Sequence, residues 1–337
     1  MNFETRGGLK RGRLKQRAAS PRRVLAGAAL CLLLTACAKL PLSPIPAPRP
    51  VSTTPPQPRP QAPSRPERSA TSDALAAYYA RAQINLLAQG LLRSDTGAQD
   101  APFTSWQLAR NFETIALNDE YTGIGGEMVA RQTASVLSRW EVPVTLSVEF
   151  GDTVGDAMRN RDTETLRGFT ARLARVTGHP IRMGSPEAAN FHVFVVNEDE
   201  RVALGPRLEQ LIPGISQTAV RTVVNLPRST YCVVLASDPQ DDGAYQSAVA
   251  IIRAEHPDLM RLSCLHEEIA QGLGLANDSP AARPSIFNDD EEFATLTPMD
   301  EQLLRMLYDP RLTPGMTADE ARASVNAIAR ELMGESS

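Results

Sequence analysis

A proline-rich stretch between residues 41 and 66 decides where this chain can fold. It reads PLSPIPAPRPVSTTPPQPRPQAPSRP and holds 11 of the 26 prolines, with almost no large apolar residue. Such a composition buries too little apolar surface to offset the chain entropy lost on folding. A globular core must therefore come from the residues that follow, and the stretch itself is typical of an extended spacer. A docking site for proline-binding domains is the alternative interpretation.

The residues before the spacer resemble a bacterial secretion signal. A run of basic residues precedes the apolar segment VLAGAALCLLLTA, Val24–Ala36, which is too short to span a bilayer as a mature helix. The overlapping motif LTAC, ending at Cys37, resembles the lipobox in which the cysteine is diacylated and becomes the new N-terminus. We expect residues 1–36 to be a signal peptide and Cys37 to carry lipid. The alternative is an uncleaved N-terminal anchor.

Processing before Cys37 would change the charge of the chain. Residues 1–36 contain eight basic residues and one acid, so the formal charge would move from −4 to −11. This argues against a nucleic-acid partner on electrostatic grounds. Attachment to the membrane would come from the acyl chains, and we expect a lipoprotein that faces the periplasm. Ala38 stands where enteric bacteria place aspartate for inner-membrane retention, which favours the outer membrane.

Two cysteines remain beyond the spacer, Cys232 and Cys264. Two thiols in an oxidising compartment are most simply interpreted as one disulfide. The alternative is a zinc-ligand or nucleophile role. Neither cysteine has a second cysteine or a histidine at ligand spacing, because His266 is only two residues from Cys264. The sequence therefore predicts a Cys232–Cys264 disulfide.

Apolar periodicity after the spacer predicts helices first and alternating strands and helices later. Residues Ser72–Arg93 have helical spacing with Ser72 or Asp73 as the N-cap, and a second helix is expected around Trp106–Leu117. The expected divisions are a signal peptide (1–36), a lipidated cysteine and spacer (37–68), a helical segment (69–130) and an α+β domain (131–337).

Four stretches of the predicted α+β domain have strand patterns. They are Trp140–Phe150, Asn190–Glu198, Ser229–Asp238 and Tyr245–Ala254. A helix with an Asp162 cap and a Gly178 stop is expected between the first two strands. A loop-rich insertion is expected between the second and third. The order is strand, helix, strand, insertion, strand, strand, helix, which indicates an α+β fold with a mixed sheet.

The last helix in that order includes CLHEEIAQGLGLAND, residues 264–278. At 100° per residue its apolar and polar side chains separate into two faces: Leu265, Ile269 and Leu273 against Glu267, Glu268 and Gln271. An ordinary amphipathic helix with a solvated acidic face accounts for this pattern as well as a binding site does.

The sequence of this helix and its continuation resembles the metzincin pattern H-E-x-x-H-x-x-G-x-x-H with every ligand replaced. Glu267, Gln271 and Asn277 stand at the histidine positions, Glu268 at the general-base position and Gly274 at the turn. Further on, SIFNDD occupies the place of the methionine turn, with Phe287 where methionine would be. Residues 296–312 are similar to the helix that closes such domains.

The span of about residues 130–316 resembles domain-of-unknown-function family 2927 of proteobacterial lipoproteins, which is thought to be zincin-like. The resemblance implies a zincin-like (metzincin-type) fold in which an active-site-type helix follows the last strand. It does not imply zinc chemistry, because zinc takes thiolate, imidazole and carboxylate ligands, and only Glu267 among the replacements is a good ligand. His266 does not repair the motif, since Ala270 lies four residues beyond it.

We therefore expect no metal and no cofactor, and a binding or scaffolding module that takes an extended peptide or an envelope protein. Glu267, Gln271, Asn277 and Asp278 are the expected binding residues. The alternative is a metal-dependent hydrolase or peptidase in which Glu268 acts with an unusual oxygen-rich metal site.

Three other motifs have simpler interpretations. GIGGE, Gly123–Glu127, lacks the flanking strand and helix of a nucleotide-binding loop and is predicted to be a plain turn. NDDEE, Asn288–Glu292, has the oxygens but not the spacing of a calcium loop, so solvated acids are expected. His192 lies within a predicted strand and is expected to be a packed residue.

Overall fold

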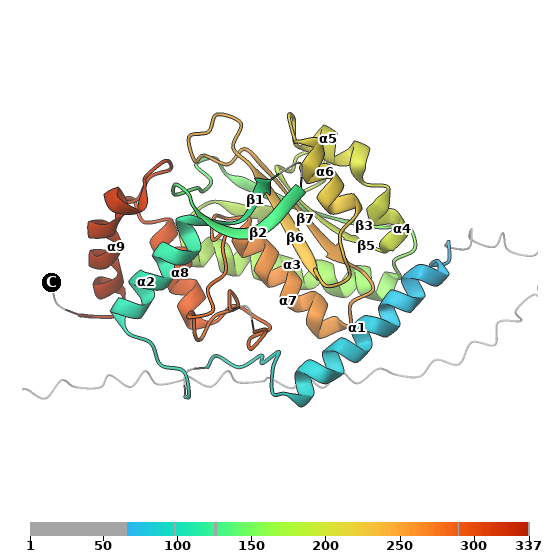
Figure 1. The fold of residues 1–337 in the computed structure, drawn as a ribbon, viewed down its shortest axis with the longest axis horizontal. Coiled ribbons are helices and arrows are strands. Elements are labelled where there is room, and N and C mark those ends of the chain that lie inside the picture. Colours follow the sequence, from blue (N-terminus) through green and yellow to red (C-terminus); the bar gives the residue numbers. More distant parts are fainter. Residues whose placement is uncertain (1–65, 98, 125–126, 289, 336–337) are drawn as a thin grey trace, which may run out of the picture. The chain divides into compact units, whose positions relative to one another are not determined.

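The computed structural model describes residues 66–97, 99–124, 127–288 and 290–335. These described residues form one compact unit (Figure 1). The expected signal peptide, the lipidated Cys37 and the proline-rich spacer lie outside the described residues. In the described part of the chain, none of the helices combines the length and the apolar character needed to cross a membrane.

A five-stranded mixed sheet forms the centre of the fold and confirms the predicted α+β class. Its strands stand in the spatial order β4, β3, β5, β7, β6, and only the edge strand β6 runs antiparallel to its neighbour. They are β3 (Val144–Phe150), β4 (Ile181–Met183), β5 (Phe191–Val196), β6 (Cys232–Ser237) and β7 (Ser247–Arg253). The short β4 was not predicted, because three residues carry no readable period.

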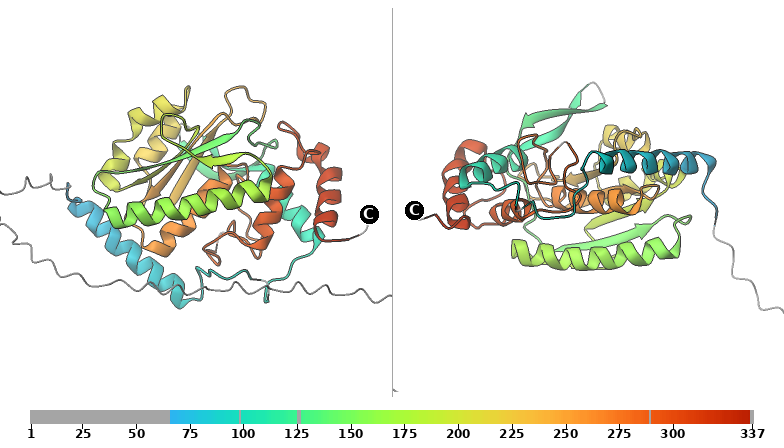
Figure 2. Two further views of the ribbon diagram at one scale, coloured as in Figure 1. Left: turned by 180° about the vertical axis from the view of Figure 1, so that it is seen from behind. Right: turned by 90° about the horizontal axis from the view of Figure 1, so that it is seen from below.

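Both faces of the sheet are covered, which explains the apolar sequences FHVFVV and AVAII of its central strands. Alternate residues of β5 and β7 point to opposite faces. One face packs on α3 (Asp156–Thr177) and α7 (Asp258–Gln271), and the other on α5 (Gly205–Leu211) and α6 (Gln217–Val224) (Figures 1 and 2).

The stretch expected as a loop-rich insertion contains α4 (Glu198–Val202), α5 and α6. Leu208 and Val223 of these helices are fully buried against the second face of the sheet. Each helix has eight residues or fewer, so periodicity in the sequence was too brief to reveal it.

Two predicted helix starts were wrong. The first helix, α1 (Ala70–Ala88), is capped by Ser69, while Ser72 is buried and donates to Glu255 Oε1 at 2.6 Å. In α3 the helix starts at Asp156, and Asp162 lies inside it. Asp162 is buried because it pairs with Arg261 of α7, with 2.7 Å between Oδ2 and Nε.

The remaining elements pack at one side of the unit. Helix α2 (Ser105–Ala116) contacts both α8 (Pro298–Leu307) and α9 (Ala318–Leu332). Between α2 and β3 the chain forms an antiparallel hairpin, β1 (Asn118–Ile124) and β2 (Glu127–Ala134). Of the predicted turn GIGGE, Gly123 and Ile124 end β1 and Glu127 begins β2, and the two residues between them lie outside the described residues.

Candidate functional site

Helix α7 follows the last strand of the sheet and ends in a tightly packed turn. The Gly272 carbonyl at its end accepts a hydrogen bond from Trp140 Nε1 at 2.8 Å. Gly274 has a φ of +125°, and a Cβ at this position would lie 2.1 Å from the Ser138 carbonyl oxygen. Only glycine fits here. The expected turn at Gly274 is therefore a conformational and steric requirement of the fold.

Most of both faces of α7 is covered by protein, and Glu267 on the polar face is half-buried. The apolar face of Leu265, Ile269 and Leu273 packs into the core as expected. On the polar face, Glu268 is 4% exposed and Gln271 is 7% exposed. A solvated acidic face, the simpler of the two interpretations of this helix, is therefore wrong for these two side chains.

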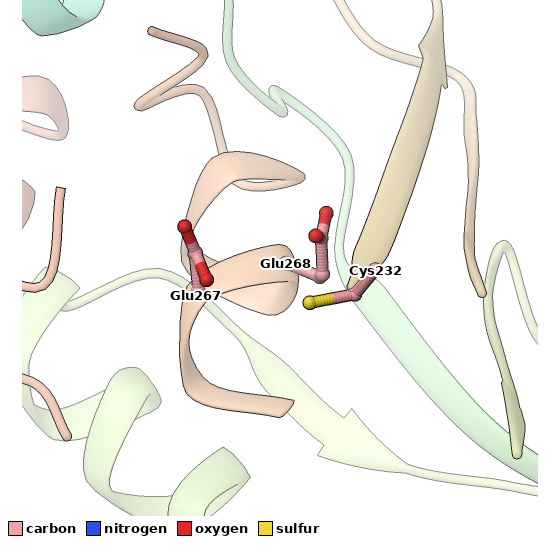
Figure 3. A group of neighbouring side chains, drawn as sticks. All are labelled: Cys232, Glu267 and Glu268. Atoms are coloured by element: carbon pink, nitrogen blue, oxygen red, sulfur yellow. The ribbon is translucent and has the colours of Figure 1, made fainter. Parts of the chain in front are cut away.

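The polar face of α7 lies beside the edge strand β6. The predicted disulfide is confirmed: Cys264 on α7 is joined to Cys232, the first residue of β6. The carboxylate oxygens of Glu267 and Glu268 and the sulfur of Cys232 all lie within 4.8 Å of one another. Figure 3 shows Cys232 pointing from its strand toward α7 and the two glutamates.

The chain returns past this face after Gly274, and it brings Asp278 to the site. Gln271 Nε2 donates to Asp278 Oδ1 at 3.3 Å. Asn277 is held by α2 instead, since its backbone N–H donates to the Ile115 carbonyl at 3.0 Å and its Nδ2 to the Thr114 carbonyl at 2.9 Å. Of the two expected binding residues on the returning chain, Asp278 has a direct hydrogen bond to Gln271, whereas the Asn277 side chain donates to Thr114.

The segment at the methionine-turn position lies directly against this returning chain. The Ser279 backbone N–H donates to the Phe287 carbonyl at 2.8 Å, and Phe287 is fully buried. Asp300 accepts hydrogen bonds from Ser285 Oγ at 2.5 Å and from the Ile286 N–H at 3.1 Å. Burial raises the pKa of Asp300 to about 6, against the opposing effect of these donors.

His266 faces away from the polar face of α7. Its ring stacks on Phe169 of α3 at a centroid distance of 4.0 Å, and its Nδ1 accepts from the Leu296 N–H at 3.2 Å. Burial lowers its pKa to about 3, and the positive charge of Arg172 contributes to the shift. His266 is therefore a neutral acceptor in the core, consistent with its exclusion from the site.

His192 and His179 also lie outside the site, whereas His256 borders it, with its Nδ1 3.8 Å from the sulfur of Cys264. His192 is buried in β5, where its Nδ1 lies 3.2 Å from both Ser147 Oγ and Glu149 Oε1, so it is the packed residue expected. Both contacts use the same ring nitrogen, whereas a serine–histidine–acid triad needs one on each. His179 Nε2 contacts the Val142 carbonyl at 2.8 Å. Burial lowers the pKa of His256 to about 3.

The acidic stretch at residues 288–292, predicted to be solvated, is exposed at Asp290 but buried at Glu292. Glu292 is 9% exposed and pairs with Arg93 at 2.8 Å and Arg283 at 2.6 Å. Its carboxylate is thus balanced by two guanidinium groups, which hold its pKa below the usual range, the Arg283 hydrogen bond most strongly. This arrangement joins residue 93 to the loop after α7.

A second polar cluster, which was not predicted from the sequence, lies at the carboxyl ends of β5 and β7. Glu198 contacts Arg201 at 2.6 Å and Arg253 at 2.7 Å, and both arginines are almost fully buried. Glu255 accepts from the Glu198 N–H at 2.6 Å. The only sequence signal was a charged residue within two positions of each apolar run, Glu198 after FHVFVV and Arg253 after AVAII.

Comparisons with known proteins place the chain in a family without assigning an activity. Neither the curated proteins nor the solved structures gave a match to this chain. A family model described as "Protein of unknown function (DUF2927)" matches residues 105–327, about two thirds of the 337 residues. The match covers the sheet, α7 and the returning chain, and it extends from α2 into α9. The chain belongs to this family of unknown function.

Proposed function

We propose that this chain is a lipid-anchored cell-envelope protein whose zincin-like domain binds an extended peptide without cleaving it. The observation that carries the proposal is the buried polar face of α7 beside the edge strand β6. Glu268 and Gln271 are both less than 10% exposed, although burying polar groups costs free energy that an apolar face would avoid. A binding role gives a reason to keep them.

The topology supports the zincin-like frame. An antiparallel edge strand precedes the last parallel strand, and the site helix follows that strand. The glycine turn after the helix and the contact from Ser279 to Phe287 match the order of turn and methionine-turn segments on which the family resemblance rests.

The residues present do not fit the zinc site of such a frame. Gln271 and Asn277 offer amides in place of imidazoles, and the amide nitrogens donate to Asp278 and to Thr114. The two sulfurs are joined to each other and are not thiolates. Zinc sites require deprotonated thiolate, imidazole or carboxylate ligands. We therefore derive no hydrolytic step for this site.

Strand β6 provides the means of binding a peptide. Within the described residues it pairs with β7 on one side only. An edge strand can accept an extended peptide through main-chain hydrogen bonds, and alternate side chains of the peptide then set specificity. A peptide along β6 would pass the half-buried carboxylate of Glu267, which favours basic or hydrogen-bond-donating residues at that point.

A peptide-retention experiment tests the proposal and its hydrolase alternative together. Immobilised full-length protein in detergent is incubated with a defined library of acetylated, amidated nonapeptides, and the retained and released peptides are identified by mass spectrometry. We expect intact peptides to be retained, with basic residues enriched. Glu267→Arg should abolish retention. Glu164→Arg, at an exposed position of α3, should leave retention unchanged. Cleaved peptides, lost on chelation, would support the hydrolase instead; an empty retained fraction would contradict peptide binding.

A gain-of-zinc variant tests the frame separately. In Glu267→His/Gln271→His, two imidazoles one helical turn apart would join the carboxylate of Asp278 as a three-ligand site. We expect zinc affinity to rise at least about 10-fold over the parent. Adding Asp278→Ala should remove the gain, whereas Asn277→Ala serves as the neighbouring control. A folded double variant without added zinc affinity would contradict the zincin-like frame.

A further inference from the structure

The polar face of α7 also carries sulfur, and its arrangement points to a second chemical state of the same site. Cys264, Glu267 and Glu268 lie within about one helical turn, so their side chains share one side of α7. Cys232 faces them from β6. Two elements thus bring two sulfurs and two carboxylates to one place.

We propose that reduction of the Cys232–Cys264 disulfide creates a binding site for a thiophilic divalent cation such as Zn²⁺, with the two thiolates and the carboxylates of Glu267 and Glu268 as ligands. In the oxidised protein the sulfurs are bonded to each other and this ligand set does not exist. The inference does not rest on peptide binding.

The distances allow such a site to form by local adjustment. One carboxylate oxygen each of Glu267 and Glu268 and the Cys232 sulfur already lie within 4.8 Å of one another. The Cys264 sulfur is bonded to Cys232 and lies 3.8 Å from His256 Nδ1. Around a tetrahedral zinc, with Zn–S of about 2.3 Å and Zn–O of about 2.0–2.2 Å, neighbouring ligand atoms are about 3.3–3.8 Å apart. For Cys232 and the two carboxylates the required movement is therefore on the scale of side-chain rotation, and in the proposed site the Cys264 side chain also rotates, away from His256 and toward the carboxylates.

The negative charge of the reduced site favours binding of a cation. Two thiolates and two carboxylates in a partly buried cluster repel one another, and Glu268 is only 4% exposed. A bound divalent cation offsets that repulsion, and metal binding releases the thiol protons. In the oxidised cluster only the carboxylates carry negative charge, so its attraction for a cation is weaker than that of the reduced cluster.

The redox step balances with a dithiol reductant. Thiolate attack breaks the Cys232–Cys264 bond through a mixed disulfide, and a second attack releases it. The two cysteines gain two electrons and two protons and become thiols, while the reductant becomes a disulfide. Metal binding then displaces the two thiol protons.

The test is a Co²⁺ titration of full-length protein in its oxidised form and after anaerobic reduction and removal of the reductant. Co²⁺ bound to thiolate gives a charge-transfer absorption, which carboxylate-only binding lacks. We expect one Co²⁺ per reduced chain, displaced by Zn²⁺, and no charge-transfer band in the oxidised protein. Glu267→Gln/Glu268→Gln should weaken the reduced site at least about 10-fold, because even second-shell changes cost about 10–100-fold. Glu187→Gln, a surface acid near β4, should leave it unchanged.

Three outcomes would overturn the inference. The first is a reduced, folded protein with two titratable thiols and no charge-transfer band. The second is equal Co²⁺ affinity in both redox states. The third is a reduced protein that loses its circular dichroism and does not recover on metal addition, since the cluster would then not persist without the disulfide.

Discussion

Helix α7 holds two buried polar regions that are built from different chemistry. At its amino-terminal end, Arg261 is 1% exposed and pairs with Asp162 at 2.7 Å and Asp258 at 2.9 Å. In its second half, Glu267 and Glu268 meet the disulfide sulfur of Cys232. The first region matches carboxylates with a guanidinium. The second region brings together two carboxylates and a sulfur atom. Groups of these kinds can bind ligands or take part in reactions.

The neighbouring strand ends resemble the first region. Although burial opposes it, hydrogen bonds and positive charge from Arg201 and Arg253 hold the pKa of Glu198 below its usual range. Buried carboxylates with arginine partners are parts of the framework, and removing one partner leaves an uncompensated charge. Substitutions at the amino end of α7 should therefore lower the free energy of unfolding, whereas substitutions on its polar face should change binding.

Arg261→Ala should have the largest effect. It leaves Asp162 buried without its guanidinium and should lower the free energy of unfolding by about 3–5 kcal/mol. Denaturant unfolding followed by circular dichroism measures the change. The double variant Arg261→Met/Asp162→Leu, which removes both charges, should recover most of it. Equal losses in the two variants would contradict the assignment of this pair to the framework.

Gly274→Ala tests the turn that returns the chain past the polar face. The substitution forces a Cβ into a +125° φ and against the Ser138 carbonyl, so we expect a loss of about 3 kcal/mol. Gly178→Ala is the matched control, because Gly178 has a φ of +68° with open space around its Cβ position. It should lose only about 1 kcal/mol. A similar small loss at Gly274 would mean that the turn adapts.

Acid should weaken the framework through two buried histidines. Burial lowers the pKa of His256 and His266 to about 3, below the unfolded value near 6.5. The unfolded chain then binds more protons, so their contribution is complete above pH 6.5 and is lost as the pH falls toward 3. Each histidine should contribute a slope of about 1.4 kcal/mol per pH unit in that window. Unfolding curves at several pH values measure it, and His256→Leu/His266→Leu should flatten the dependence. Unchanged slopes would contradict burial of both rings.

Glu267→Gln should have the smallest effect on stability, less than about 1 kcal/mol, because its side chain is only half-buried. In the same variant, retention of basic peptides should fall. Thermal unfolding and peptide retention measured on one preparation compare the two effects. A loss of stability as large as that of Arg261→Ala would place Glu267 in the framework and remove the distinction between the two regions.

Much of the fold could be predicted because long, regular patterns carry it. The strands near 144–150, 191–196, 232–237 and 247–253 and the amphipathic face of α7 were all read from local periodicity. The disulfide was predicted from the count of cysteines and an expected oxidising compartment, and it is present between Cys232 and Cys264. Asp162 was misread because its short polar side chain is typical of a cap, whereas its role in α3 is set by Arg261, 99 residues away.

In the candidate site, too, some features followed from local sequence patterns and others depended on distant parts of the chain. The sequence by itself determined that Glu267, Glu268 and Gln271 share one face of a helix, because the helical repeat fixes the direction of each side chain. It also determined that a glycine turn follows. Only the tertiary structure decided that this face is buried against β6, that Asp278 and not Asn277 bonds to Gln271, and that His266 stacks on Phe169. The physical reason is that burial and partner choice depend on surfaces brought together from distant parts of the chain, and a local repeat holds no information about which surface will arrive.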